Sequence, residues 1–163
     1  MSKSDGYLYY EAGQAVAAAH LRLTIRRISG NPAISASDIQ LPRNNPKIRM
    51  ILWLTGLAAE KKGVGRSDPL RRMRNRQRVR SLVNGVIAEL TGTMTKRQAE
   101  ARCLLNQAQD RANAICGSLY EAIETVVQRL RVQPAVTGEE VDAIVAEVKA
   151  RQPPTEVRNE ISA

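Results

Sequence analysis

Apolar residues recur every three or four positions through most of this 163-residue chain, which is the spacing of helices that bury one face. In the first half, the pattern predicts helices over about residues 7–21 and 48–60, and we expect Asp5 to cap the first. A third helix is predicted beyond Asp68, with an apolar stripe over residues 79–90. Helices therefore account for most of the predicted structure in this half.

The second half predicts one long helix and one short helix. Thr95 and Gln98 form a capping-box pattern, and the helix that it starts is expected to run to about residue 131. Thr137 and Glu140 repeat the capping pattern before the last helix. The inward stripes are predicted to be Ala101, Leu104, Leu105, Ala108, Ala112, Ile115, Leu119, Ile123, Val126 and Leu130 on the first, and Val141, Ile144, Val145 and Val148 on the second.

A small amount of strand is predicted between the first two helices. Residues 21–28 alternate apolar and polar, and a turn-rich connector over 29–47 has room for a short strand around Ile39 and Leu41. We therefore expect a mainly α (α+β) fold in one domain over residues 1–150, with a small β element and a C-terminal helical hairpin. Residues 151–163 are expected to be a disordered tail.

One heptapeptide on the first predicted helix has the form of a zinc-peptidase motif without its ligands. Zinc peptidases of this type carry His-Glu-x-x-His on a helix, where the histidines hold the metal and the glutamate is the general base. Here Tyr10 and Gln14 stand at the histidine positions, and Glu11 stands at the glutamate position. A neutral phenol and a neutral amide are poor zinc ligands. The chemistry is therefore predicted to be absent.

The segment Glu11-Ala12-Gly13-Gln14-Ala15-Val16 resembles the corresponding box of the FtsH-type AAA zinc peptidase family. Leu54-Thr55-Gly56-Leu57-Ala58-Ala59-Glu60 is similar to a second helix of that family, and Ser67-Asp68-Pro69-Leu70 stands where the family has its third zinc ligand. The resemblance covers roughly residues 7–149 of this chain and is to the peptidase domain of that family. It implies a helical peptidase-like fold, vestigial metal positions at Tyr10, Gln14 and Asp68, and a peptide-binding groove beside the first strand.

Without a metal, we expect Glu11 to be a partly buried acid held by a neighbouring donor or arginine, and we expect no cofactor. The interpretation that follows is a catalytically inactive, cytoplasmic interaction or regulatory module, a pseudopeptidase and not an enzyme. An active zinc metallopeptidase is the least favoured interpretation. No run of about 18 apolar residues is present, so no membrane span is expected.

The net charge of +9 is concentrated in one segment. Residues 61–80 contain nine basic residues and one acid, and we call these nine the basic tract. They are Lys61, Lys62, Arg66, Arg71, Arg72, Arg74, Arg76, Arg78 and Arg80. At 100° per residue, the arginines of the third helix are not expected to form a single stripe.

The basic tract is the predicted contact surface, and its charge calls for an acidic partner. An acidic protein is favoured over nucleic acid, because the chain has only five aromatic residues for stacking on bases. A basic nucleic-acid-associated protein on the same scaffold remains the alternative function. Self-association of the chain into an oligomer is left open by the sequence.

Overall fold

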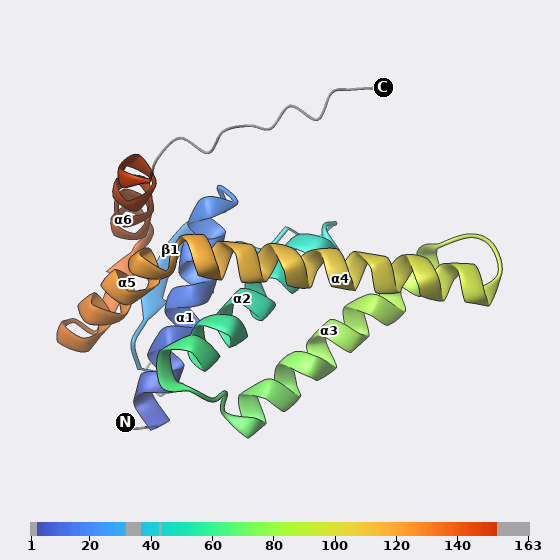
Figure 1. Cartoon of the computed structure of the whole chain (residues 1–163), viewed down its shortest axis with the longest axis horizontal. Coiled ribbons are helices and arrows are strands. Elements are labelled where there is room, and N and C mark those ends of the chain that lie inside the picture. Colours follow the sequence, from blue (N-terminus) through green and yellow to red (C-terminus); the bar gives the residue numbers. More distant parts are fainter. Residues whose placement is uncertain (1–2, 32–36, 43, 153–163) are drawn as a thin grey trace.

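The computed structural model describes residues 3–31, 37–42 and 44–152, and within them it confirms a mainly helical α+β fold. Figure 1 shows the long helices α3 and α4 meeting at one end of the molecule, with α1 and α2 between them and the C-terminal helices. In chain order, the elements are α1 (Lys3–His20), β1 (Ile25–Ser29), β2 (Asp38–Ile39), α2 (Pro46–Val64), α3 (Pro69–Glu89), α4 (Met94–Ser118), α5 (Tyr120–Val132), β3 (Ala135–Thr137) and α6 (Gly138–Arg151).

The three strands form one antiparallel sheet in the order β2-β1-β3. Ile25 of β1 lies opposite Ile39 of β2, and Ile28 of β1 lies opposite Val136 of β3. The short strand expected around Ile39 is therefore confirmed. Because β1 is the central strand, a peptide cannot add to it as a new edge, and the groove expected beside the first strand is not available in that form.

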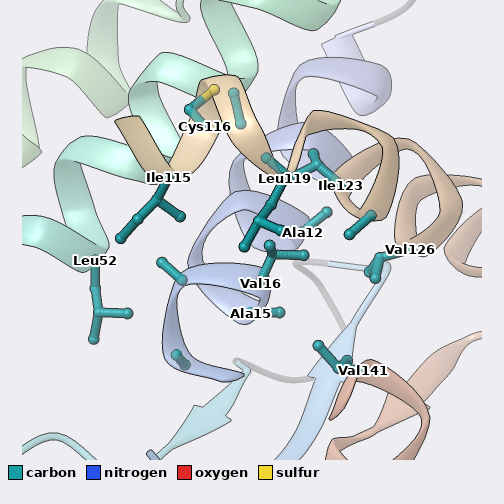
Figure 2. Packing of buried hydrophobic residues seen from close by; sticks show 14 of the residues in the cluster. Ala12, Ala15, Val16, Leu52, Ile115, Cys116, Leu119, Ile123, Val126 and Val141 are labelled. Carbon is teal, nitrogen blue, oxygen red and sulfur yellow. The ribbon is translucent and has the colours of Figure 1, made fainter. Parts of the chain in front are cut away.

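Helix α1 lies at the centre of the hydrophobic core. Figure 2 shows its small side chains, among them Ala12 and Val16, surrounded by Ile115 and Leu119 from the C-terminal half. Ala12 and Val16 are fully buried. Burial of apolar surface at this helix is the main favourable term holding the two halves of the chain together.

Helices α1 and α2 approach closely where glycines face the neighbouring helix. A Cβ atom on Gly13 would lie 2.6 Å from the Cβ of Ala59, and one on Gly56 would lie 2.9 Å from the ring of Tyr10. Real Cβ atoms do not come this close, so both positions require glycine or a rearrangement. The close crossing fixes the face of α1 that carries Tyr10 against α2.

The long C-terminal helix predicted from the sequence is two helices. Leu119 has φ −112° and ψ 23°, outside helical geometry, and its side chain is buried. The bend lets α4 pack on α2 while α5 packs on α1. One apolar stripe thus packs against two different helices. The regular spacing of its residues does not reveal where the direction of the helix changes. The stripe itself is largely confirmed, although Leu104 and Leu105 are only half-buried.

Three predicted boundaries need correction. Helix α1 already includes Lys3, so Asp5 is not its cap and instead pairs with Arg131 at 3.1 Å. The cap of α4 is Thr93, whose hydroxyl accepts from the backbone N–H of Lys96, and not Thr95. Helix α2 continues beyond its predicted end at residue 60 as far as Val64.

The capping box of Thr137 and Glu140 is confirmed, with both side chain–backbone hydrogen bonds present. Helix α6 buries Val141, Ile144 and Val145, as its stripe predicted. The expected tail over residues 151–163 begins too early, because Arg151 is the last residue of α6, and residues 153–163 lie outside the described part of the chain. Among the described helices, none is long and apolar enough to cross a membrane.

Candidate functional site

Tyr10 is committed to a buried hydrogen bond. Its hydroxyl donates to Oδ1 of Asn75 on α3 over 3.0 Å, and its ring lies against Gly56. Both side chains are almost fully buried. Burial raises the pKa of the Tyr10 phenol, although the hydrogen bond to Asn75 opposes the rise. Tyr10 therefore ties α1 to α3 as a protonated phenol, which is a poor metal ligand.

Glu11 is a buried acid held by hydroxyl donors, as its sequence context predicts. It is 9% exposed, and its carboxylate accepts hydrogen bonds from the hydroxyl of Ser37 and the phenol of Tyr7. Burial raises the pKa of Glu11, while these donors and two nearby arginines, Arg71 and Arg78, lower it. The result is a structural acid that links α1 to the segment before β2.

Asp68 is the N-cap of α3. Its side chain accepts from the backbone N–H of Arg71 over 2.9 Å, and Pro69 follows as the first helical residue. Gln14 is half-buried on α1. The three vestigial metal positions thus offer a phenol engaged with Asn75, an amide and a capping carboxylate, and this set does not fit zinc. No group of three or more potential metal-binding side chains occurs among the described residues.

A buried ion pair fixes the start of α3 against the end of α2. Oε1 of Glu60 accepts from the backbone N–H of Asp68 over 2.9 Å and pairs with the guanidinium of Arg71. Glu60 is 1% exposed, and Arg71 also lies 5.6 Å from the ring of Tyr7. We call Glu60, Asp68 and Arg71 the α2–α3 latch. Because a Cβ on Gly6 would lie 2.9 Å from Oε1 of Glu60, that glycine makes room for it.

The latch changes the interpretation of the basic tract. Arg71, Asn75 and Arg78 follow helical spacing on one face of α3, and this face turns toward α1 and α2. Arg71 is bound in the latch, and the guanidinium of Arg78 lies 5.6 Å from the ring of Trp53. Arg71 is therefore held within the fold, and its membership of a contact surface stays a prediction. The helical spacing of Arg71, Asn75 and Arg78 indicated that they share one face of α3. Charge alone did not distinguish the two arginines from the other arginines of the basic tract.

Three other arginines share a second face of α3. Arg72, Arg76 and Arg80 are spaced four residues apart, so they project from one side of the helix. All three are exposed. The expectation that the arginines do not form a single stripe is therefore confirmed. Arg72, Arg76 and Arg80 lie on one face of α3, and Arg71 and Arg78 lie on another.

This second face borders an open groove of about 1060 Å³ between α2, α3 and α4. Figure 1 shows α3 diverging from α4, with α2 between them. We call it the basic groove. None of its described lining residues is acidic. Its apolar floor comes from Leu54, Leu57, Ala58, Val79, Val83 and Leu105, its cations are Lys61, Lys62, Arg72, Arg76 and Arg80, and α4 contributes Asn106, Gln109 and Asn113.

The remaining members of the basic tract, Arg66 and Arg74, are exposed but do not line the groove. Lys62 is partly engaged, because its Nζ lies 4.0 Å from the centre of the Tyr120 ring. The structure thus brings together five of the nine predicted contact residues. It assigns Arg71 to the latch and sets Arg78 beside Trp53.

The sequence did not reveal the roles of Glu60, Asn75 and Ser37. Asn75 and Ser37 bind partners that lie 65 and 26 positions away, and such pairs leave no local pattern. Glu60 lies within an apolar helix, and an acid there is a signal of a buried partner that could have been used.

We expect Glu11→Gln to stabilise the chain at neutral pH. Because the pKa of Glu11 is raised above its ordinary 4.5, the folded state binds this proton more tightly than the unfolded chain. That contribution is present at low pH and is lost as pH rises through the folded-state pKa. Glutamine mimics the protonated acid. Urea melts should therefore show no difference well below pH 4.5, where the carboxyl is protonated in both states, and a more stable variant near about pH 7.

The matched control is Glu100→Gln, because Glu100 is an exposed glutamate on α4. It should change the free energy of unfolding little at either pH. A Glu11→Gln variant that is less stable than the unmodified chain near about pH 7, and by more than at low pH, would show that the charged carboxylate is required.

A scan against protein-family models and a search of curated proteins found no match to this sequence.

Proposed function

We propose that this chain is a catalytically inactive, peptidase-like interaction module that binds an acidic protein partner through the basic groove. The observation that carries the proposal is the composition of the groove, where five cations border an apolar floor and no described lining residue is acidic. Such a surface favours partners of opposite charge and also offers apolar area to bury. The resemblance to FtsH-type peptidases supports the scaffold part of the proposal.

The absence of catalysis is supported by the chemistry of the former metal positions. Tyr10 donates its hydroxyl proton to Asn75, and Asp68 caps α3. The carboxylate of Glu11 accepts hydrogen bonds from the hydroxyls of Ser37 and Tyr7.

We expect the purified chain to retain no stoichiometric zinc and to cleave no unfolded protein substrate. Elemental analysis after dialysis against zinc-containing buffer, followed by zinc-free buffer, is the measurement. The double variant Tyr10→His and Gln14→His is the matched comparison, because it restores the two imidazoles at helical spacing. About one zinc per chain in the unmodified protein would contradict the proposal and favour an active peptidase.

The burial of the aromatic residues argues against the alternative function, nucleic-acid binding. Tyr9, Tyr10 and Trp53 are buried, and Tyr7 and Tyr120 are half-buried. None is an exposed platform on which an unpaired base could stack. A phosphate backbone over the groove would also leave its apolar floor without an apolar partner.

We expect the triple variant Arg72→Gln, Arg76→Gln and Arg80→Gln to lose partner capture while remaining folded. All three side chains are exposed, and glutamine has a helix propensity close to that of arginine. Immobilised wild-type and variant chains are exposed to nuclease-treated native lysate, and the captured proteins are compared. Capture should fall by at least about tenfold, which corresponds to about 1.4 kcal/mol.

The matched control removes the same charge elsewhere, with Arg22, Arg27 and Arg102 changed to glutamine. These arginines are exposed and do not line the groove. Equal capture by the two triple variants would refute the groove as the contact surface. Binding that disappears with nuclease, and that falls linearly in log affinity against log salt, would favour the nucleic-acid alternative.

A further inference from the structure

The apolar floor of the basic groove is built from half-buried side chains of three helices. Leu54 and Leu57 come from α2, Val83 from α3 and Leu105 from α4, and each is only half-buried. Leu105 was expected to be a core residue of the long helix. Its partial exposure at the floor means that apolar area remains for another molecule to cover.

The cations lie along the groove instead of at one point. At 1.5 Å per residue, Arg72 and Arg80 are separated by about 12 Å along α3, with Arg76 between them. Lys61 and Lys62 stand at the end of α2. A single carboxylate or phosphate would engage only one part of this row. The row is matched by a ligand whose negative charges also repeat at about one helical turn.

The size of the groove agrees with a helix as that ligand. The open groove has a volume of about 1060 Å³, and a helix that lies along about 12 Å of it contributes about eight residues. That length matches the span of the three arginines. The opposite wall carries Asn106, Gln109 and Asn113, whose amides add no charge and can hydrogen-bond to polar side chains.

We propose that the basic groove binds an acidic amphipathic helix of a partner protein, with its apolar face on the floor and its carboxylates toward Arg72, Arg76 and Arg80. This inference rests on the proposed function and adds the form of the partner. Binding of an amphipathic helix in an apolar groove uses anchors at helical spacing for affinity. The arginine row then selects acidic over basic helices.

The test uses three fluorescein-labelled synthetic peptides of about 18 residues, or about five turns. The first places leucines along one face and glutamates beside them. The second has the same composition with its leucines distributed around the helix, and the third replaces every leucine by alanine. Fluorescence anisotropy with the full chain should give the first peptide a dissociation constant at least about tenfold lower than either of the others.

Two valine substitutions separate floor contacts from charge alone. Val83→Gln changes the groove floor, whereas Val132→Gln changes a valine that is 85% exposed on α5 and does not line the groove. Val83→Gln should weaken the first peptide by at least about tenfold, and Val132→Gln should leave it unchanged. Circular dichroism of both variants checks their folding.

A measurement on the unmodified chain covers the case in which Val83→Gln does not fold. Methyl NMR signals of Leu57, Val83 and Leu105 should shift with the first peptide, while those of Val126 and Val141 in the core should not. Shifts confined to remote methyls would overturn the proposal.

The inference fails if the three peptides bind equally, even when binding depends on the arginine row. In that event the proposed function survives, because an acidic partner would still bind through the groove. The proposed function fails separately if both arginine triple variants capture the same proteins. A dimer of the chain alone that Val83→Gln dissociates would put a second copy in the groove and would also overturn the inference.

Discussion

Glu60→Ala is expected to destabilise the chain by about 3–5 kcal/mol, because it removes one partner of a buried ion pair. Glu60 is 1% exposed, and it accepts hydrogen bonds from the guanidinium of Arg71 and from the backbone N–H of Asp68. Without Glu60, the guanidinium of Arg71 loses the carboxylate with which it pairs, although the Arg71 side chain is only 20% exposed. The measurement is the free energy of unfolding from denaturant melts.

An exposed pair supplies the control for this experiment. Lys96 and Glu100 are 4.0 Å apart on α4 with largely exposed side chains, so Glu100→Ala should cost less than about 1 kcal/mol. Replacing Glu60 and Arg71 together by methionine should restore much of the loss, because no charge is then left buried alone. Equal costs for Glu60→Ala and Glu100→Ala would mean that the latch does not hold α3.

Ile115→Ala is expected to cost about 2–5 kcal/mol, because it leaves a cavity where α4 packs on the core. Ile115 is 1% exposed, and Figure 2 shows it beside α1 with Leu119. Leu105→Ala should cost less than Ile115→Ala, since Leu105 is half-buried at the groove floor and its site is already open to solvent on one side. Denaturant melts again provide the measurement.

Gln128→Ala is the control for the helical phase. Gln128 is exposed on α5, so its truncation should change stability by no more than about 0.5 kcal/mol. Similar costs for Ile115→Ala and Gln128→Ala would show that the buried stripe of the C-terminal helices is misassigned.

The sequence predicted the helical fold well where a local pattern determines the structure. The stripe from Ala101 to Leu130 and the capping box at Thr137 both depend on neighbours within a few positions. The bend at Leu119 was missed, because it is imposed by packing against two different helices and leaves the apolar period unbroken. The cap of α4 was missed by two residues, since Thr93 and Thr95 offer the same hydroxyl chemistry.

The candidate site was harder to predict, because its contacts join residues far apart in the chain. Charge identified the basic tract, but only the latch separates Arg71 from Arg72. Likewise, the motif suggested an emptied metal position at Tyr10, while its hydrogen bond to Asn75 spans 65 positions. No single-sequence pattern carries that pairing.

The shallow attachment of α3 has a consequence for the range of partners. Of its 21 residues, only Asn75 and Val79 are buried, whereas α2 buries eight of 19. The latch and the Tyr10–Asn75 hydrogen bond hold the start of α3, but no residue of the helix beyond Val79 is buried. Opening of that second part therefore exposes little apolar surface and costs much less free energy than global unfolding. Backbone amides in α3 should exchange with deuterium sooner than those of α2. If the proposed groove binds a partner helix, a wall with this freedom would let the basic groove adjust its width to apolar side chains of different bulk.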